Sequence, residues 1–379
     1  MNRVDAFLEL VIKQGGSDLH LVSGNPPRIR LHGEAFTVKY RELTSKETQD
    51  LLFEIMPPGI KDIFDKNGGA DFAYEVTNLA RFRVNVFQHL GGIGAVFRAI
   101  PNKIQTLSEL NLPPVLKNLC RQQKGLILVT GPTGSGKSTT LSAMVDFINS
   151  NKKGHIITIE DPIEFIHSNK SCLVSQREIG SHTESFTDAL RSSLREDPDV
   201  ILIGEMRDLE TIHLALTAAE TGILVIATLH TSGAASSLDR IINVFPAGEE
   251  PYVRTMLSTS LVAVISQQLI RTADQKSRVA ALEIMINNSA VSNIIREGKT
   301  DQLDNIIQSG AMHGMQRMDA ALKRLLDAQI ISGEEAYLKA RNKATFENYR
   351  NEDNIAETSD EQETTTPYSG SSSDNIINV

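Results

Sequence analysis

A ten-residue stretch at positions 131–140, GPTGSGKSTT, combines the residue types that bind phosphate groups. Gly131, Gly136, Lys137 and Ser138 complete the pattern G-x-x-x-x-G-K-[ST]. Glycines allow a turn to point its backbone N–H groups at phosphate oxygens, and a helix that starts there adds the positive end of its dipole. The apolar run before the stretch predicts a strand and the amphipathic run after it predicts a helix, which is the context that phosphate binding requires.

The stretch is therefore expected to hold a nucleoside triphosphate. Lys137 would reach the β- and γ-phosphates, and the Ser138 hydroxyl would bind Mg²⁺. A purely structural glycine turn, capped by Ser or Thr, would not need the lysine, so the nucleotide interpretation is favoured. The residues predicted to contact the nucleotide are Gly131, Pro132, Thr133, Gly134, Ser135, Gly136, Lys137, Ser138 and Thr139.

Three further apolar runs end in residues that could hydrolyse a bound triphosphate. HIITIED ends in Glu160 and Asp161, with Glu164 just beyond; DVILIGE ends in Glu205, and ATLHT brings His230. The carboxyl ends of parallel strands meet at one edge of a sheet, so these groups should converge on the phosphate loop. Hydrolysis needs a metal-binding acid and a group that orients the attacking water.

The predicted catalytic roles follow from this convergence. We expect Glu205 to act as a ligand of Mg²⁺ and its water or as the base, and Glu160 or Glu164 to polarise the attacking water. The division of labour between these acids stays open. Each also has a structural alternative, because acids after strands often cap helices and a histidine at a strand end is often only a satisfied polar residue. Four functional strand ends at once favour the catalytic interpretation.

The elements that must position these residues are of two kinds. From about residue 115, four apolar runs alternate with helical patterns, which predicts a parallel sheet covered on both faces. Beyond residue 250 the chain is expected to be mostly helical.

Residues 1–105 instead predict a small α+β domain: short strands at 18–21 and 28–34, a helix from a capping box at Thr44 and Glu47, and three consecutive strands at 70–76, 80–90 and 92–100. The predicted domains are thus 1–105, a linker at 106–115, an α/β domain at 116–350 and a disordered acidic tail at 351–379.

Composition limits the classes of protein to which the chain can belong. Of the net charge of −9 over 379 residues, seven acids without Lys or Arg lie in 351–379, which leaves the rest near −2 and argues against direct nucleic-acid binding. No run approaches 18 uninterrupted apolar residues, so no transmembrane helix is expected, and Asp5 and Glu9 in the first apolar run argue against a secretory signal. Two cysteines do not make a disulfide framework.

Several motifs together resemble those of a known family. GPTGSGKSTT, ITIEDPIEF, LREDPDVILIGEMRD and TGILVIATLHT resemble, in order and spacing, the Walker A, Asp box, Walker B and His box motifs of the secretion and pilus ATPase superfamily. GGSDLHL, RFRVNVFQHLGGIGAVFRAIP and HGMQRMDAAL narrow the resemblance to the type IV pilus twitching-motility (PilT-like) retraction ATPases. The resemblance covers roughly residues 3–345.

This resemblance implies a PAS-like N-terminal domain followed by a RecA-like P-loop ATPase domain, which assemble as a homo-hexamer that uses ATP and Mg²⁺. It implies that Arg81 and Arg83 of RFRVN, with Arg195 of LREDPD, neutralise the γ-phosphate. It also implies a motor for pilus retraction, peripheral at the cytoplasmic face of the inner membrane. Its partners would be an inner-membrane platform protein and, as a further candidate, a second retraction ATPase.

Alternatives to a main retraction motor stay open. They are an accessory retraction ATPase, or a low-turnover nucleotide-binding ring subunit of a related secretion or DNA-uptake machine. The chain departs from the family pattern at three positions: Ile223 replaces the first histidine of the His box, Glu196 replaces a glutamine, and Ser292 replaces an arginine in AVSNIIREGK. These changes bear on retraction efficiency and partner choice more than on ATP binding.

Overall fold

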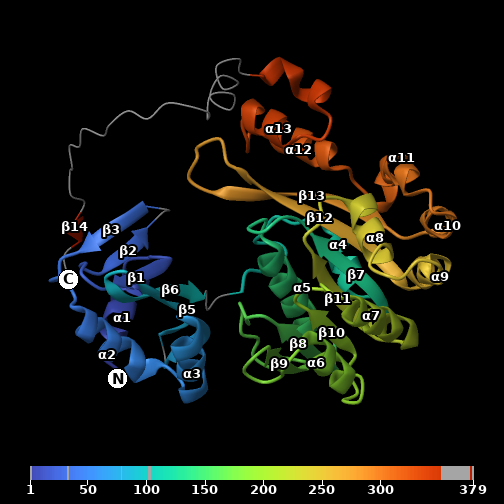
Figure 1. Cartoon of the computed structure of the whole chain (residues 1–379). Helices are drawn as coiled ribbons and strands as arrows, with labels where there is room; N and C mark the ends of the chain where they lie inside the picture. The colour runs from blue at the N-terminus through green and yellow to red at the C-terminus, as the bar shows by residue number, and fades with distance from the viewer. Residues whose placement is uncertain (1, 32–33, 78, 101–103, 351–375, 378–379) are drawn as a thin grey trace. The chain divides into compact units, whose positions relative to one another are not determined.

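The structure, a computed structural model, describes residues 2–31, 34–77, 79–100, 104–350 and 376–377. They fall into two compact units, one made of the residues up to 100 with 376–377 and one made of residues 104–350 (Figure 1). Almost all of the predicted acidic tail at 351–379 lies outside the described residues. Among those described, no helix has both the length and the apolar character needed to cross a bilayer.

The first unit is a seven-stranded sheet in the order β14-β3-β2-β1-β6-β5-β4, with three helices. All of its strand pairs are antiparallel except β14 with β3. The elements are α1 (Asp5–Lys13), β1 (Asp18–Val22), β2 (Arg28–Leu31), β3 (Glu34–Val38), α2 (Ser45–Ile55), α3 (Pro58–Asn67), β4 (Gly69–Val76), β5 (Ala80–His89), β6 (Gly92–Ile100) and β14 (Ile376–Ile377).

Local sequence signals account for most of this unit. The three consecutive strands β4, β5 and β6 are confirmed, and so is the capping box: the Glu47 N–H donates to Thr44 Oγ1, and the Thr44 N–H donates to a Glu47 carboxylate oxygen 2.9 Å away. Helix α3 was not expected, because the prediction ended the preceding helix at Pro57. Pro58 instead occupies the first position of a new helix, where proline needs no N–H partner.

The second unit contains a seven-stranded sheet in the order β13-β12-β7-β11-β10-β8-β9, parallel except for β13. Its strands are β7 (Gly125–Thr130), β8 (His155–Glu160), β9 (Leu173–Glu178), β10 (Val200–Ile203), β11 (Leu224–Leu229), β12 (Leu261–Arg271) and β13 (Arg278–Ile286). Its helices are α4 (Val115–Cys120), α5 (Lys137–Asn151), α6 (Phe186–Ser193), α7 (Leu209–Thr221), α8 (Ala234–Ile242), α9 (Glu250–Ser260), α10 (Ser289–Glu297), η1 (Thr300–Gln302), α11 (Leu303–Ser309), η2 (Gly310–His313), α12 (Met318–Asp327), α13 (Gly333–Lys339) and η3 (Lys343–Tyr349).

The expectation of a parallel sheet with both faces covered is confirmed. Successive residues of β7 enter two different cores: Leu126 and Leu128 pack with α7, α8 and α9, whereas Ile127 and Val129 pack with α4 and α5. All four side chains are fully buried. Burial on both faces explains why the strand is apolar throughout instead of alternating.

The expectation of a mostly helical chain beyond residue 250 is wrong for β12 and β13. Strand β12 inserts beside β7 and is buried on both faces along most of its length, so its first five residues, Leu261–Ile265, are all apolar and show no period of two. It also follows α9 directly, since the helix ends at Ser260 and the strand begins at Leu261, with no turn residue to mark the change. A short apolar run of this kind cannot be told from a buried helix by its pattern.

Candidate nucleotide site

The phosphate loop lies between the end of β7 and the start of α5, as predicted. Gly131, Gly134 and Gly136 have φ values of 146°, 78° and 85°, a range that residues with a side chain rarely adopt. A Cβ at Gly131 would overlap the carbonyl oxygen of Gln267, and one at Gly136 would lie 2.8 Å from the Gln267 side-chain nitrogen. The glycines are thus required both by the backbone turn and by the close approach of β12.

Gln267 on β12 holds this loop in place, although it was not among the predicted site residues. Its Nε2 donates to the carbonyl of Ser135 at 2.7 Å, and its Oε1 accepts a hydrogen bond from the Thr140 hydroxyl at 2.7 Å. All three residues are buried. The only local signal is the polar stretch Ser266–Gln268 between apolar residues.

Lys137 begins α5 and is held across the loop. Its ammonium donates to the carbonyl oxygens of Gly131 (2.8 Å) and Pro132 (3.1 Å). Burial lowers the pKa of Lys137, while the carboxylates of Glu205 and Glu164 oppose that shift.

A second group in the loop also suits an anion. The Ser135 hydroxyl is buried and has no hydrogen-bond partner in the part of the chain that the structure describes. A lysine, a spare hydroxyl and the first N–H groups of a 15-residue helix together fit a phosphate group.

Glu205 lies just beyond β10 and is brought to His230, as the strand order predicts. One carboxylate oxygen pairs with Arg207 Nη2 at 2.7 Å, and the other lies 3.3 Å from His230 Nε2. Burial raises the pKa of Glu205, but the hydrogen bond from Arg207 and the charge of His230 outweigh it and hold that pKa below its usual value. Glu205 is therefore an ionised acceptor. Arg207 was not among the predicted site residues, although it follows Glu205 in the motif GEMRD.

Glu160, the last residue of β8, has different surroundings. Its Oε1 accepts hydrogen bonds from the Thr158 hydroxyl (2.6 Å) and from Gln176 Nε2 (3.3 Å). Burial nevertheless raises the pKa of Glu160 to about 7, and the nearby charge of Glu164 acts in the same direction. Glu164 itself is exposed on the loop after β8. Glu160 can thus take up or release a proton near neutral pH.

The three predicted arginines come from two parts of the chain. Arg81 and Arg83 are on β5 of the first unit and share one face of the strand, because Phe82 between them is fully buried on the other. The Arg83 Nε atom lies 3.8 Å from an Asp71 carboxylate oxygen. Arg195 is exposed on the turn after α6. The role of the three arginines toward a γ-phosphate stays a prediction.

Two of the three departures from the family pattern have local partners. The carboxylate of Glu196 pairs with Arg177 on β9, with both of its oxygens within 2.8 Å of Nη2, so its added charge is balanced there. The Ser292 hydroxyl donates to the carbonyl of Ser258 on α9 at 2.8 Å and lies 3.0 Å from Asn287 Oδ1. The serine therefore faces α9, where an arginine would be too long to make the same contacts.

Comparison with known proteins agrees with this geometry. The family model described as Type II/IV secretion system protein matches residues 1–364. The type IV pilus retractation ATPase PilT of Pseudomonas aeruginosa is 52% identical over 338 residues, which cover 89% of this chain and 98% of that protein. A twitching motility protein of Neisseria gonorrhoeae is 51% identical over 316 residues, which cover 83% of this chain and 84% of that protein.

A solved structure resembles the chain over almost its whole length. The crystal structure of the pilus retraction motor PilT with bound ADP matches with a TM-score of 0.86 at 42% identity, and the match covers 92% of this chain and 99% of that chain. The α/β fold with a parallel sheet is therefore confirmed, and the N-terminal unit has its counterpart in the same structure. Nucleotide binding is supported by the same match, because that structure holds ADP.

Proposed function

This chain belongs to the type II/IV secretion system protein family, within which it is an ATPase, and we propose that it is a hexameric motor that retracts type IV pili. The observation that carries this proposal is the meeting of three strand ends at one edge of the sheet. At this edge the charge of Glu205 acts on the Lys137 ammonium of the phosphate loop. The same Glu205 carboxylate is paired with His230.

The residues at this edge can divide the work of ATP hydrolysis. The backbone of the phosphate loop and Lys137 would hold the phosphates, and Ser138 with Glu205 would hold Mg²⁺, which offsets charge on the phosphate oxygens. The fit rests on an ionised carboxylate and a hydroxyl in the first turn of α5. Glu160, whose pKa lies near 7, would orient the attacking water and accept its proton, with Glu164 as the alternative.

The ring, the partners and the location are further parts of the proposal. Arg81, Arg83 and Arg195 would neutralise the γ-phosphate when subunits assemble, a contribution of about 10³–10⁵-fold in other phosphoryl-transfer enzymes. Closure and reopening of the domains during turnover would do the mechanical work. The motor would act at the cytoplasmic face of the inner membrane on a pilus platform protein.

One observation favours an accessory rather than the main retraction ATPase. Ser292, where the family has an arginine, faces the carbonyl of Ser258, so this position offers no exposed cation to a partner. An accessory motor would keep ATP turnover and work beside a second retraction ATPase.

Steady-state phosphate release by the purified protein tests the enzymatic part of the proposal. Glu205→Gln should bind nucleotide like the wild type but turn over about tenfold more slowly or worse, because the phosphate loop survives while water and metal positioning are lost. Glu210→Gln, an exposed acid on α7, is the matched control. Turnover of the wild type equal to that of Lys137→Ala would reject the motor.

A gene deletion tests the biological part. Excess surface pili with loss of twitching would support retraction, and cells without pili would show an assembly role instead. Loss of twitching only when a second retraction ATPase is also deleted would identify an accessory motor.

A further inference from the structure

Glu283, on β13, is a buried carboxylate that the chemistry proposed above does not use. It is 1% exposed and lies opposite Ser266 of β12, which in turn lies beside Thr130 of β7. Three polar residues thus form one row across three strands, at the level where β7 gives way to the phosphate loop. A row of buried polar residues inside an apolar sheet destabilises the fold unless each side chain has a hydrogen-bond partner.

The row holds the turn that follows β11. The Gly233 N–H donates to the Ser266 hydroxyl at 2.9 Å, and the Ala234 N–H donates to Glu283 Oε1 at 2.9 Å. Thr130 Oγ1 lies 3.4 Å from the hydroxyl of Ser237 in the first turn of α8. The turn that is anchored in this way begins at His230, the residue that contacts Glu205.

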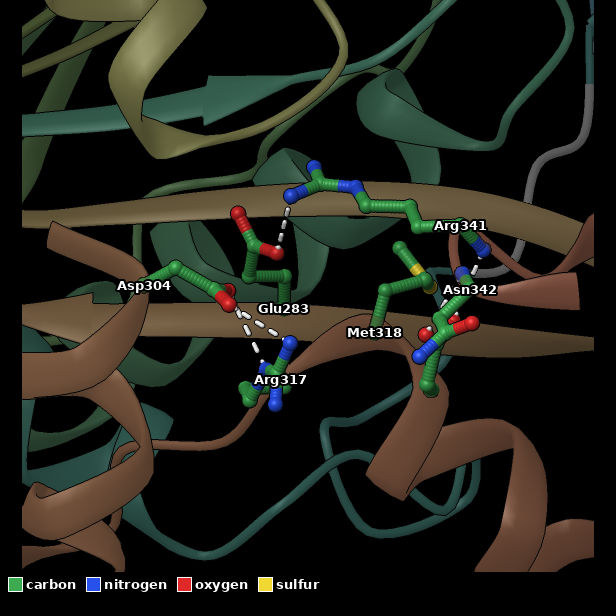
Figure 2. A pocket seen from close by; sticks show the side chains of 7 residues that line it. Glu283, Asp304, Arg317, Met318, Arg341 and Asn342 are labelled. Carbon is green, nitrogen blue, oxygen red and sulfur yellow. Dashed lines mark hydrogen bonds and ion pairs between the residues drawn. The ribbon is translucent and has the colours of Figure 1, made fainter. Parts of the chain in front are cut away.

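Arg341, which lies between α13 and η3, supplies the positive charge that pairs with Glu283. Its Nη1 lies 2.7 Å from Glu283 Oε2, as Figure 2 shows. The backbone N–H groups of Arg341 and Asn342 donate to the two carboxylate oxygens of Asp319 at 2.8 and 2.9 Å, which fixes the segment from which the side chain extends. A Cβ at Gly233 would overlap the guanidinium, so Arg341 also packs on the turn itself.

We propose that Glu283 and Arg341 form a positioning pair, through which the segment of α12, α13 and η3 sets the place of His230 at the nucleotide site. Without Arg341, the buried Glu283 carboxylate loses its ion pair, and it must move or admit water. Either change would disturb its bond to Ala234 and hence the turn.

The pair is expected to affect turnover and not nucleotide binding. The next residue of β12, Gln267, faces the other side of the sheet and holds the phosphate loop independently. Loss of Arg341 therefore leaves the phosphate cradle in place while it releases the turn that carries His230. The proposal rests on the role proposed above for Glu205, which His230 contacts.

The test is a set of variants measured for kcat, for KM for ATP and for affinity for ADP. Arg341→Ala should lower kcat about tenfold or more, with KM and ADP affinity within about twofold of the wild type. Glu283→Gln keeps an oxygen for Ala234 without the charge, so the double variant Arg341→Ala/Glu283→Gln should recover to within about threefold of Glu283→Gln alone. Arg341→Lys, which keeps the charge, should be intermediate.

The control is Arg317→Ala. Arg317 pairs with Asp304 beside the same pocket of about 260 Å³; among the residues that the structure describes, its side chain bonds to Asp304 and Gln308 and not to the turn after β11 (Figure 2). Equal kcat for Arg341→Ala and Arg317→Ala would overturn the proposal, and so would a double variant as slow as Arg341→Ala.

Hydrogen exchange separates failure of this proposal from failure of the ATPase function. The amides of residues 233 and 234 should exchange faster in Arg341→Ala and return toward the wild-type rate in the double variant, whether or not the protein hydrolyses ATP. Unchanged exchange at these amides in Arg341→Ala would overturn the pairing. A wild type that turns over no faster than Lys137→Ala, with exchange as expected, would reject the ATPase reading alone.

Discussion

Replacement of Gln267 by methionine tests whether β12 controls nucleotide affinity. Methionine has a similar length and fills the space, but it offers neither the donor for the Ser135 carbonyl nor the acceptor for the Thr140 hydroxyl. A buried polar group that loses its partner costs about 1–3 kcal/mol, so the two together could cost about 2–6 kcal/mol. We use the lower end of that range, about 2 kcal/mol.

The cost falls on the nucleotide-binding shape of the loop, because one bond joins β12 to Ser135 in the loop and the other joins it to Thr140 in the first turn of α5. Since about 1.4 kcal/mol is a factor of ten, affinity for ADP should fall about thirtyfold. The assay is titration with a fluorescent ADP analogue at constant Mg²⁺, followed by competition with unlabelled ADP.

The neighbouring residue provides the control. Gln268→Met is the same change one position along β12, on the opposite face of the strand, where no bond to the phosphate loop is made. Equal affinities of Gln267→Met and Gln268→Met would refute the reasoning, because they would show that the loop keeps its shape without the brace.

Three more predictions concern single sites. Burial raises the pKa of Glu160 to about 7, so the carboxyl group that would orient water is mostly protonated below that pH. The value of kcat/KM should therefore rise with pH through an inflection near pH 7. Thr158→Val removes a hydrogen bond to the carboxylate and should move that inflection to higher pH. Arg177→Ala should lower the free energy of unfolding by about 0.5–1 kcal/mol in urea titrations, and much less in a Glu196→Gln background. Gly131→Ala should weaken ADP binding about 100-fold in the fluorescence assay, because φ of 146° strains alanine by up to about 3 kcal/mol; binding like the wild type would contradict the loop geometry.

The parts of the fold that were predictable are those with a local cause. Strands β7, β8, β10 and β11 are apolar runs bounded by helical patterns, and the glycines of the phosphate loop mark positive φ directly. Strands β12 and β13 were not predictable, because the insertion of β12 beside β7 is decided by pairing between residues far apart in the chain.

The residues of the site also differ in whether their roles have a local cause in the sequence. Lys137, Glu205 and His230 could be assigned because each follows a strand of a parallel sheet, whose carboxyl ends meet at one edge. Gln267, Glu283 and Arg341 could not, because each acts through a contact with a distant segment. Their polar character inside or after apolar runs was visible, but the partner of each was not.

The brace from β12 also has a consequence for synthesis of the chain. The bond from Gln267 to Ser135 joins residues 132 positions apart, so the loop leaves the ribosome long before the strand that shapes it. At about 5–20 residues per second the delay is on the order of ten seconds. During that interval a nascent chain has the complete phosphate-loop sequence but lacks the hydrogen bond from Gln267 that holds the loop. We therefore expect the affinity of the chain for ATP to reach its full value only after β12 has been translated.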